Sequence, residues 1–190
     1  MDIQEATTRR LPDLKERHLP ENCREAVNTL LKEIYGYRQF RNLEIYDDLS
    51  KGKDKLCISQ GQLVESIILE AEKAWKDEAQ VDNVLLTAPT GSGKSLLFQL
   101  PAIYLGKEYK LLTIVISPLK ALIVDQVESL QDLGYTRVAY ASSDLSPEQK
   151  MEVYRQVCEG EIDLFYLSPE LLLSYDIKHF IGERRIGLVV

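Results

Sequence analysis

A chain of 190 residues, 45% of them apolar and 28% charged, is long enough for one domain with a full core but too short for two large ones. The formal net charge of −7 excludes a protein that coats nucleic acid through general positive charge, so contacts with nucleic acid must be local. The sequence has neither a signal-peptide pattern nor an apolar run of membrane-spanning length, which predicts a soluble, intracellular protein.

The cysteines and histidines are too scattered to predict a metal site or a nucleophile. Cys23, Cys57 and Cys158 are odd in number, far apart and without metal-ligand spacing, so we expect reduced, mostly buried thiols. His18 and His179 are isolated from each other and from the cysteines.

The N-terminal part is predicted to contain two helices. Residues 1–20 show no periodicity and are expected to form an arm that is partly disordered. Gly36 is placed to end the first helix, residues 47–55 are charged and read as a loop, and a second helix is predicted over 62–76. The predicted buried faces are Val27, Leu30, Leu31 and Ile34 in the first helix and Val64, Ile67, Ile68, Ala71 and Trp75 in the second.

Residues 87–95 (TAPTGSGKS) form the most informative segment. They follow the apolar run 84–86 and precede the amphipathic stretch 96–105, and this order of strand, glycine-rich loop and helix start is typical of a phosphate-binding loop. The usual pattern has glycine where Ala88 stands, and alanine is small enough for a tight turn.

Each residue type in this loop has a physical role in binding a triphosphate. Gly91 and Gly93 let the backbone turn inward so that successive N–H groups face the phosphates, and the helix dipole adds to that field. Lys94 is expected to reach the β- and γ-phosphates, and the hydroxyl of Ser95 to hold Mg²⁺. The predicted phosphate site therefore comprises Thr90, Gly91, Ser92, Gly93, Lys94 and Ser95.

From residue 84 onward strand-like and helix-like segments alternate, which predicts an α/β fold with a parallel sheet and helices on both faces. Ser-Pro-Glu at 146–148 and at 168–170 is expected to start helices, with serine as the cap and proline in the first position. Ligands then lie at the carboxyl ends of the strands. Strands are predicted over 84–86, 111–116, 137–140, 162–167 and 186–190, and a helix over 119–133.

Four segments in register with the loop resemble the first RecA-like domain of a superfamily 2 helicase, and within it the RecQ branch of the DEAD/DEAH-box enzymes. Residues 95–102 (SLLFQLPA) are similar to the stretch after motif I. Residues 117–122 (SPLKAL) with 125–127 (DQV) resemble motif Ia, and residues 166–171 (YLSPEL) resemble motif Ib. Residues 36–41 (GYRQFR) look like the lead of the adenine-reading Q motif, so the resemblance covers roughly 30–190.

The resemblance implies an ATP-dependent helicase that uses ATP and Mg²⁺ and acts on single-stranded or partly duplex nucleic acid, with DNA expected. It implies backbone contacts from Ser117, Lys120 and Ser168. Strand-end hydroxyls and helix-start N–H groups bind phosphate without net positive charge, although Ser-Pro is also an ordinary helix start.

The residue that reads adenine has two candidates. In the family the glutamine closely follows Phe-Arg, and here Glu44 stands there, whereas Gln62 comes after an apparent insertion, residues 45–60. An amide both donates and accepts, which discriminates ATP from GTP, while a carboxylate can only accept. We prefer Gln62, with a plain surface glutamine as the alternative, and expect Arg41 or Tyr37 to stack on the base.

Hydrolysis requires a strand-end carboxylate for Mg²⁺ and a group that orients water. In the family both come from the DEAD/DEAH box, which follows a strand resembling 186–190, where the chain stops. Asp125 is expected on a helix flank, and Asp82 and Asp163 at the wrong ends of strands. We therefore assign no catalytic residue and expect an inactive fragment that lacks motif II and the second RecA-like domain.

The predicted organisation is an arm over 1–20, a helical region with the Q-motif-like segment over 21–82, and the N-terminal part of RecA-like domain 1 over 83–190. Two other functions stay open. One is a phosphate-loop ATPase or kinase without a nucleic-acid role. The other is a non-enzymatic, nucleotide-responsive nucleic-acid-binding module that ends at Val190.

Overall fold

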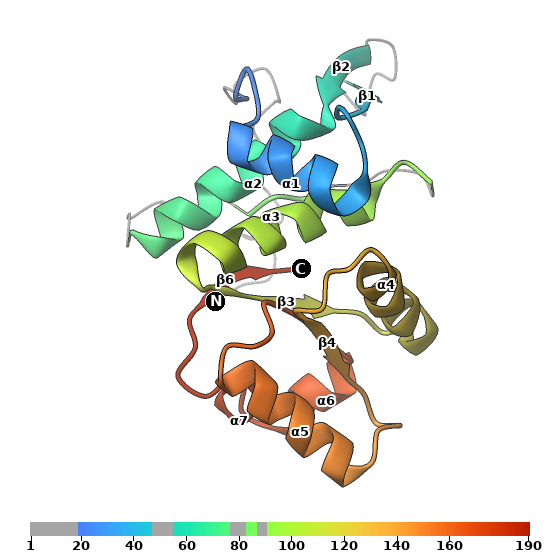
Figure 1. The fold of residues 1–190 in the computed structure, drawn as a ribbon, viewed down its shortest axis with the longest axis vertical. Coiled ribbons are helices and arrows are strands. Elements are labelled where there is room, and N and C mark those ends of the chain that lie inside the picture. Colours follow the sequence, from blue (N-terminus) through green and yellow to red (C-terminus); the bar gives the residue numbers. More distant parts are fainter. Residues whose placement is uncertain (1–18, 47–54, 77–82, 87–90) are drawn as a thin grey trace, which may run out of the picture.

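The computed structural model of the chain describes residues 19–46, 55–76, 83–86 and 91–190. Within these residues a four-stranded parallel sheet lies between two layers of helices (Figure 1), as the alternation of the sequence predicts. Residues 1–18 of the predicted arm (1–20) and residues 47–54 of the predicted loop (47–55) lie outside the described residues, and Lys55 begins a strand.

The sheet has the strand order β4-β5-β3-β6. Neighbouring strands are parallel, and Ile116 at the end of β3 is paired with Leu167 at the end of β5. The strands are β3 (Leu112–Ile116), β4 (Val138–Ala141), β5 (Leu164–Leu167) and β6 (Ile186–Val189).

Alternate residues of β3, β4 and β5 enter two separate cores, because successive side chains point to opposite faces of a sheet. Val115 and Tyr166 face one helical layer, whereas Ile114 and Phe165 face the other. The first layer is α1 (Glu25–Tyr35), α2 (Gln60–Trp75), α3 (Lys94–Tyr109) and α4 (Lys120–Asp132). The second layer is α5 (Pro147–Cys158), α6 (Pro169–Ser174) and α7 (Lys178–Ile181).

The predicted helix boundaries are largely confirmed. Helix α1 ends at Gly36, whose φ of 69° lies in the left-handed region that glycine adopts without strain. Helix α5 begins with the predicted capping box between Ser146 and Gln149. Helix α2 begins at Gln60, two residues earlier than predicted, and its buried side includes two carboxylates, Glu65 and Glu72, that the periodicity did not predict.

Residues 84–86 do not form the predicted strand. They are irregular, and Leu85 is 76% exposed. Strand β6 is therefore an edge strand among the described residues. The apolar composition of a short run favours a strand only when a partner supplies the ladder of hydrogen bonds, and these residues pair with none of the described strands.

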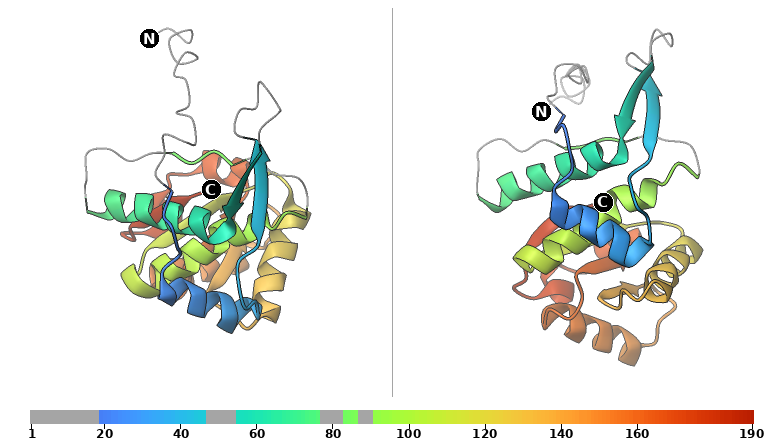
Figure 2. Two further views of the ribbon diagram at one scale, coloured as in Figure 1. Left: turned by 90° about the horizontal axis from the view of Figure 1, so that it is seen from above. Right: turned by 45° about the horizontal axis from the view of Figure 1, so that its top comes forward.

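An antiparallel hairpin was not predicted. Strands β1 (Asn42–Tyr46) and β2 (Lys55–Ser59) pair in register from Asn42 opposite Ser59 to Tyr46 opposite Lys55. Figure 2 shows the hairpin extending away from the body, beside the start of α2. Its strands include residues 45–46 and 55–59 of the segment 45–60 that the sequence presents as an insertion. The hairpin brings Arg41 next to Gln60, whose N–H donates to the Arg41 carbonyl at 2.9 Å.

The prediction of mostly buried thiols is wrong for two cysteines. Cys57 and Cys158 are exposed, and Cys23 is half-buried; all three are free. Cys57 lies on the projecting hairpin and Cys158 ends α5, where burial depends on packing that local sequence does not report. Burial raises the pKa of the Cys23 thiol to about 12, and the neighbouring Glu65 carboxylate adds to the shift.

An ion cluster joins the segment before α1 to α2. The Arg24 guanidinium lies 2.6 Å from Glu65 and 2.5 Å from Glu72, and it also donates to the Tyr104 hydroxyl at 2.8 Å. Burial raises the pKa of Glu72, but hydrogen bonds from Arg24 and Tyr109 outweigh it and leave the pKa below its ordinary value. The charges are therefore paired where helices α1, α2 and α3 meet.

Helices α1 and α2 share one core with α3 and the sheet, so residues on both sides of the predicted boundary at 82/83 pack together. That boundary remains a prediction. Among the residues that the structure describes, none of the helices combines the length and apolar character needed to cross a membrane.

We predict that Glu65→Gln lowers the free energy of unfolding by about 1–3 kcal/mol, since it removes a charged acceptor from the Arg24 guanidinium in a buried setting. Glu70→Gln on the same helix is the matched control. Its carboxylate pairs with the half-exposed Lys73, and its loss should cost less than about 1 kcal/mol. Urea unfolding measures both, and an equal loss would contradict a stabilising role for the Arg24 cluster.

Candidate functional site

The glycine-rich loop leads directly into α3. Gly91 has a φ of 80° and Gly93 a φ of 82°. Both therefore occupy the left-handed conformation, which glycine adopts more readily than any other residue. Gly93 is the N-cap of α3 and supplies no side-chain cap, and Lys94 and Ser95 form the first turn. Thr90 lies outside the described residues.

The described part of the loop suits a phosphate. The first N–H groups of an α-helix lack intrahelical partners and bind anions, helped by the helix dipole. Lys94 is exposed at this end of α3. The Ser92 hydroxyl is buried and has no hydrogen-bond partner among the described residues, as expected of a polar group whose ligand is external.

Connectivity places this loop at the carboxyl edge of the sheet. Helix α3 ends at Tyr109 and β3 begins at Leu112, so α3 runs back along β3 and starts where the strands end (Figure 1). The loops that follow β3, β5 and β4 lie at the same edge, which is where open α/β sheets bind ligands.

The serines that follow β3 and β5 lie side by side at the carboxyl edge of the sheet. The Ser117 N–H donates to the Leu167 carbonyl at 3.1 Å, which brings Ser117 next to Ser168. The Ser168 side chain caps nothing, although Ser168 is the N-cap of α6, and its hydroxyl is buried with no partner in the described residues. The Ser117 hydroxyl accepts only a long hydrogen bond, 3.4 Å, from the N–H of Leu119.

Lys120 is paired with a carboxylate that the sequence did not single out. Its ammonium lies 2.8 Å from Asp144 and 2.6 Å from the Ser143 hydroxyl, both in the loop after β4. The hydrogen bond from Lys120 lowers the pKa of Asp144, so Asp144 is ionised at neutral pH. A phosphate that binds Lys120 at this edge of the sheet must therefore displace Asp144 from the Lys120 ammonium.

The adenine-reading candidates lie near the start of α2. The Gln62 carboxamide belongs to the α2 capping box: its oxygen accepts from the Ser59 N–H at 2.9 Å, and its Nε2 donates to the Pro20 carbonyl at 3.0 Å. Glu44 is exposed on β1. Arg41 lies with its guanidinium carbon 6.0 Å from the centre of the Tyr37 ring, at the limit of a cation–π contact.

Gln60 contacts the loop and was missed from the sequence. It is 2% exposed, and its Nε2 donates to the Ser92 carbonyl at 3.2 Å. A Cβ added at Gly93 would lie 2.6 Å from this Nε2, so Gly93 is required both by its φ and by the approach of Gln60. No local signal distinguishes Gln60 from Gln62, because the contact joins residues 32 positions apart.

Gln99 connects the helix of the phosphate loop to three neighbouring elements. Its Nε2 donates to the Tyr166 hydroxyl at 3.2 Å and to the Gln126 side chain at 3.0 Å, and its oxygen accepts from the Tyr35 hydroxyl at 3.1 Å. Burial raises the pKa of Tyr166 to about 12, so the hydroxyl keeps its proton. The middle of α3 is thus tied to β5, α4 and α1.

The carboxylates considered for Mg²⁺ are placed as predicted where they are described. Asp125 is exposed on α4. Asp163 precedes β5, is 2% exposed and lies 2.6 Å from Arg137, so it is a structural group at the opposite edge of the sheet. Asp82 lies outside the described residues.

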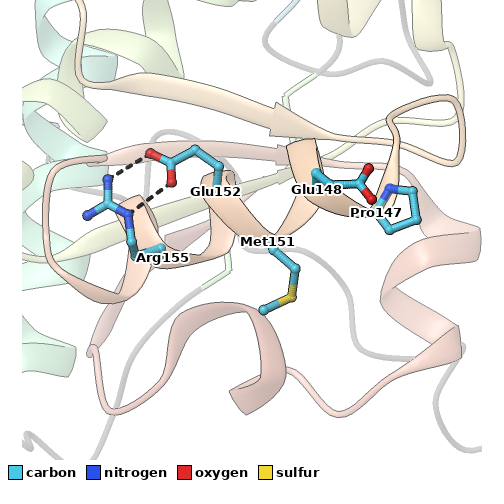
Figure 3. Close-up of a pocket in the computed structure, with 5 residues that line it drawn as sticks. All are labelled: Pro147, Glu148, Met151, Glu152 and Arg155. Atoms are coloured by element: carbon cyan, nitrogen blue, oxygen red, sulfur yellow. Dashed lines mark hydrogen bonds and ion pairs between the residues drawn. The ribbon is translucent and has the colours of Figure 1, made fainter.

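A surface hollow beside α5 lies apart from these residues. All of its lining side chains come from one face of α5, and two of them, Glu152 and Arg155, pair with each other (Figure 3). One helix face supplies no convergent polar groups, so we do not assign the nucleotide to this hollow.

A parallel sheet covered on both faces, with a glycine-rich loop opening a buried helix at its carboxyl edge, defines an α/β protein of the phosphate-loop class. Residues 69–190 match the DEAD/DEAH box helicase family, and the chain belongs to this family.

The curated relatives carry RecQ-type names, which confirms the RecQ-like resemblance. The chain is 32% identical over 165 residues to ATP-dependent DNA helicase RecQ of Synechocystis sp., covering 87% of this chain and 28% of the relative. It is 31% identical over 166 residues to ATP-dependent DNA helicase Q-like 5 of Arabidopsis thaliana, covering 87% and 14%. It is 32% identical over 163 residues to RecQ of Bacillus subtilis, covering 86% and 22%. The chain thus spans less than a third of each of these relatives.

We predict that Gly93→Ala destabilises the fold more than Gly91→Ala. A side chain at either φ costs about 1–2 kcal/mol. Nothing lies within 4 Å of a Cβ at Gly91, whereas at Gly93 the Gln60 carboxamide must move and give up its hydrogen bond, which adds about 1 kcal/mol. Urea unfolding of the two variants measures the difference, and equal values would argue against tight packing of Gln60 on the loop.

Proposed function

We propose that this chain supplies the ATP-binding part of an ATP-dependent DNA helicase. The observation that carries the proposal is the phosphate loop at the start of α3, on the same edge of the sheet as the ends of β3 and β5. Membership of the DEAD/DEAH box helicase family and the names of the relatives support it. Unwinding itself would also require a DEAD/DEAH box and a second RecA-like domain.

The family implies the use of ATP, and the described loop residues suit its phosphates. We infer that the backbone N–H groups from Thr90 to Ser95 surround the β- and γ-phosphates and that Lys94 neutralises part of their charge. The Ser95 hydroxyl would be a ligand of Mg²⁺, which would neutralise further charge on the phosphates.

The Q-motif-like segment would place the base beside α2. We keep Gln62 as the candidate adenine reader, because its amide can still donate one hydrogen and accept one more bond beyond its capping partners. Arg41 and the neighbouring Tyr37 remain candidates for stacking on the base.

We infer that Ser117, Lys120 and Ser168 contact the backbone of single-stranded or partly duplex DNA. Ser117 offers a half-buried hydroxyl at the end of β3. The adjacent Ser168 hydroxyl has no other partner in the described structure, but it is buried and must be uncovered before a DNA backbone can reach it. Backbone contacts of this kind fix the position of a strand without reading its sequence. DNA as the substrate also implies a place of action inside the cell.

A phosphate-loop ATPase without a nucleic-acid role remains the alternative enzyme. Stimulation of ATP hydrolysis by single-stranded DNA in the full-length protein separates the two. Hydrolysis that is insensitive to DNA would favour the alternative.

We predict that Lys94→Ala abolishes ATP binding measurable by calorimetry, because Lys94 is the one side-chain cation in the loop sequence 87–95. Lys107→Ala, in the last turn of the same helix, is the control and should bind ATP like the wild type. Equal affinity of the Lys94 variant and the wild type would contradict the assignment of the loop.

We predict that Lys120→Ala and Ser168→Ala weaken binding of single-stranded DNA equally across sequences in the full-length protein. The slope of log affinity against log salt should fall by about 0.7 for Lys120→Ala, as one phosphate contact is lost, and remain unchanged for Ser168→Ala. Lys32→Ala on α1 is the control. Fluorescence anisotropy over a salt series measures all three, and a change in sequence preference would contradict backbone contact.

We predict that Asp144→Asn strengthens binding of single-stranded DNA, because it removes the carboxylate that holds the Lys120 ammonium at 2.8 Å. The gain should be largest at low salt, where charge interactions are least screened. It should disappear in the double variant Lys120→Ala with Asp144→Asn. A gain that persists in the double variant would show that Asp144 acts only through general charge.

A further inference from the structure

A single buried carboxamide joins the two halves of the candidate nucleotide site. Gln60 is 2% exposed at the first position of α2. Its Nε2 donates to the Ser92 carbonyl at 3.2 Å, and its Oε1 accepts from the Arg41 N–H at 3.2 Å. The Gln60 N–H also donates to the Arg41 carbonyl at 2.9 Å. One residue thus connects the Q-motif-like segment with the glycine-rich loop.

The hydrogen bond to Ser92 decides which way the loop presents its polar groups. A trans peptide unit is planar, so the Ser92 carbonyl and the Gly93 N–H point in opposite directions. Holding the carbonyl toward the buried Gln60 therefore directs the Gly93 N–H to the other side of the loop. A phosphate is attracted by N–H groups and repelled by carbonyl oxygens, so this orientation favours anion binding.

The packing around Gly93 indicates that the loop and Gln60 fit each other closely. A Cβ at Gly93 would lie 2.6 Å from the Gln60 Nε2, whereas one at Gly91 would meet nothing within 4 Å. Gln60 therefore contacts the loop at the residue that caps α3, next to Lys94.

We propose that Gln60 is a positioning residue for the phosphate loop: it holds the Ser92 peptide in the orientation that binds phosphate and fixes that orientation to Arg41. The inference rests on the proposed function, since it assumes that the loop binds a triphosphate. A residue that merely starts α2 would stabilise the fold without changing the affinity of the folded loop for phosphate.

Gln60→Glu separates these roles, because glutamate preserves the size of the side chain and its acceptor toward Arg41. Ionised, it sets a carboxylate oxygen against the Ser92 carbonyl; protonated, it can donate to that carbonyl as glutamine does. The probe is inorganic triphosphate with Mg²⁺, measured by calorimetry from pH 5 to pH 8 on folded protein. The wild type is measured at each pH as well. The ratio of the two dissociation constants at one pH is then independent of the titration of the probe and of the groups that both proteins share.

We expect Gln60→Glu to bind triphosphate about tenfold more weakly than the wild type at pH 8, as one oriented hydrogen bond is replaced by repulsion. The ratio of the two dissociation constants should shrink toward one as the pH falls and the carboxyl gains its proton. Gln60→Met, which can neither donate nor accept at these sites, should bind more weakly at every pH. Gln149→Glu, in the capping box of α5, is the control and should match the wild type throughout.

The outcomes distinguish the two levels of inference. No binding of triphosphate by the wild type would overturn the proposed function. Wild-type binding with an equal affinity in Gln60→Glu at pH 8, or with a ratio that does not change with pH, would overturn the positioning role alone. If Gln60→Met does not fold, the pH series of Gln60→Glu still decides.

Discussion

Burial of α3 on two sides is the constraint on which the rest of the structure depends. Leu97, Leu100 and Leu105 of this helix lie in a core shared with the sheet on one side and with α1 and α2 on the other. A helix that is apolar all round is stable only when it is covered all round. Helices α1 and α2 therefore pack directly on the α/β core, and the start of α3 with its loop is fixed at the carboxyl edge.

Close contacts, two of them hydrogen-bonded, hold the same helix at three points along its length. Gln60 contacts the loop at its start, and Gln99 connects its middle to β5, α4 and α1. Near its end, Gly106 approaches Asp163 so closely that an added Cβ would lie 2.4 Å from that side chain.

The distribution of charge is compatible with the proposed binding of both nucleotide phosphates and the phosphates of a DNA backbone by an acidic chain. Buried carboxylates are paired with arginine away from the carboxyl edge, as in Arg24 with Glu65 and Arg137 with Asp163. The carboxyl edge instead presents helix-start N–H groups, hydroxyls and two lysines, Lys94 and Lys120. Local donors bind phosphate at short range, so the net charge of −7 does not oppose the site.

The sequence by itself determined the elements whose signals are local. The capping box at Ser146, the end of α1 at Gly36 and the loop glycines depend on conformations that nearby residues impose, and the alternation of strands and helices predicted the parallel sheet. The resemblance to the family rested on such short segments too, which is why it could be drawn before the fold was known.

Only the tertiary structure decided which side chains meet across long separations. It paired β1 with β2 and left residues 84–86 without a strand partner among the described residues. It also buried Glu65 and Glu72 beside Arg24, and it brought Asp144 to Lys120. It also selected Gln60 rather than Gln62 to contact Ser92. A one-residue or two-residue offset at a helix start does not change periodicity or composition, but it changes which carboxamide points at the loop, and only packing fixes that offset.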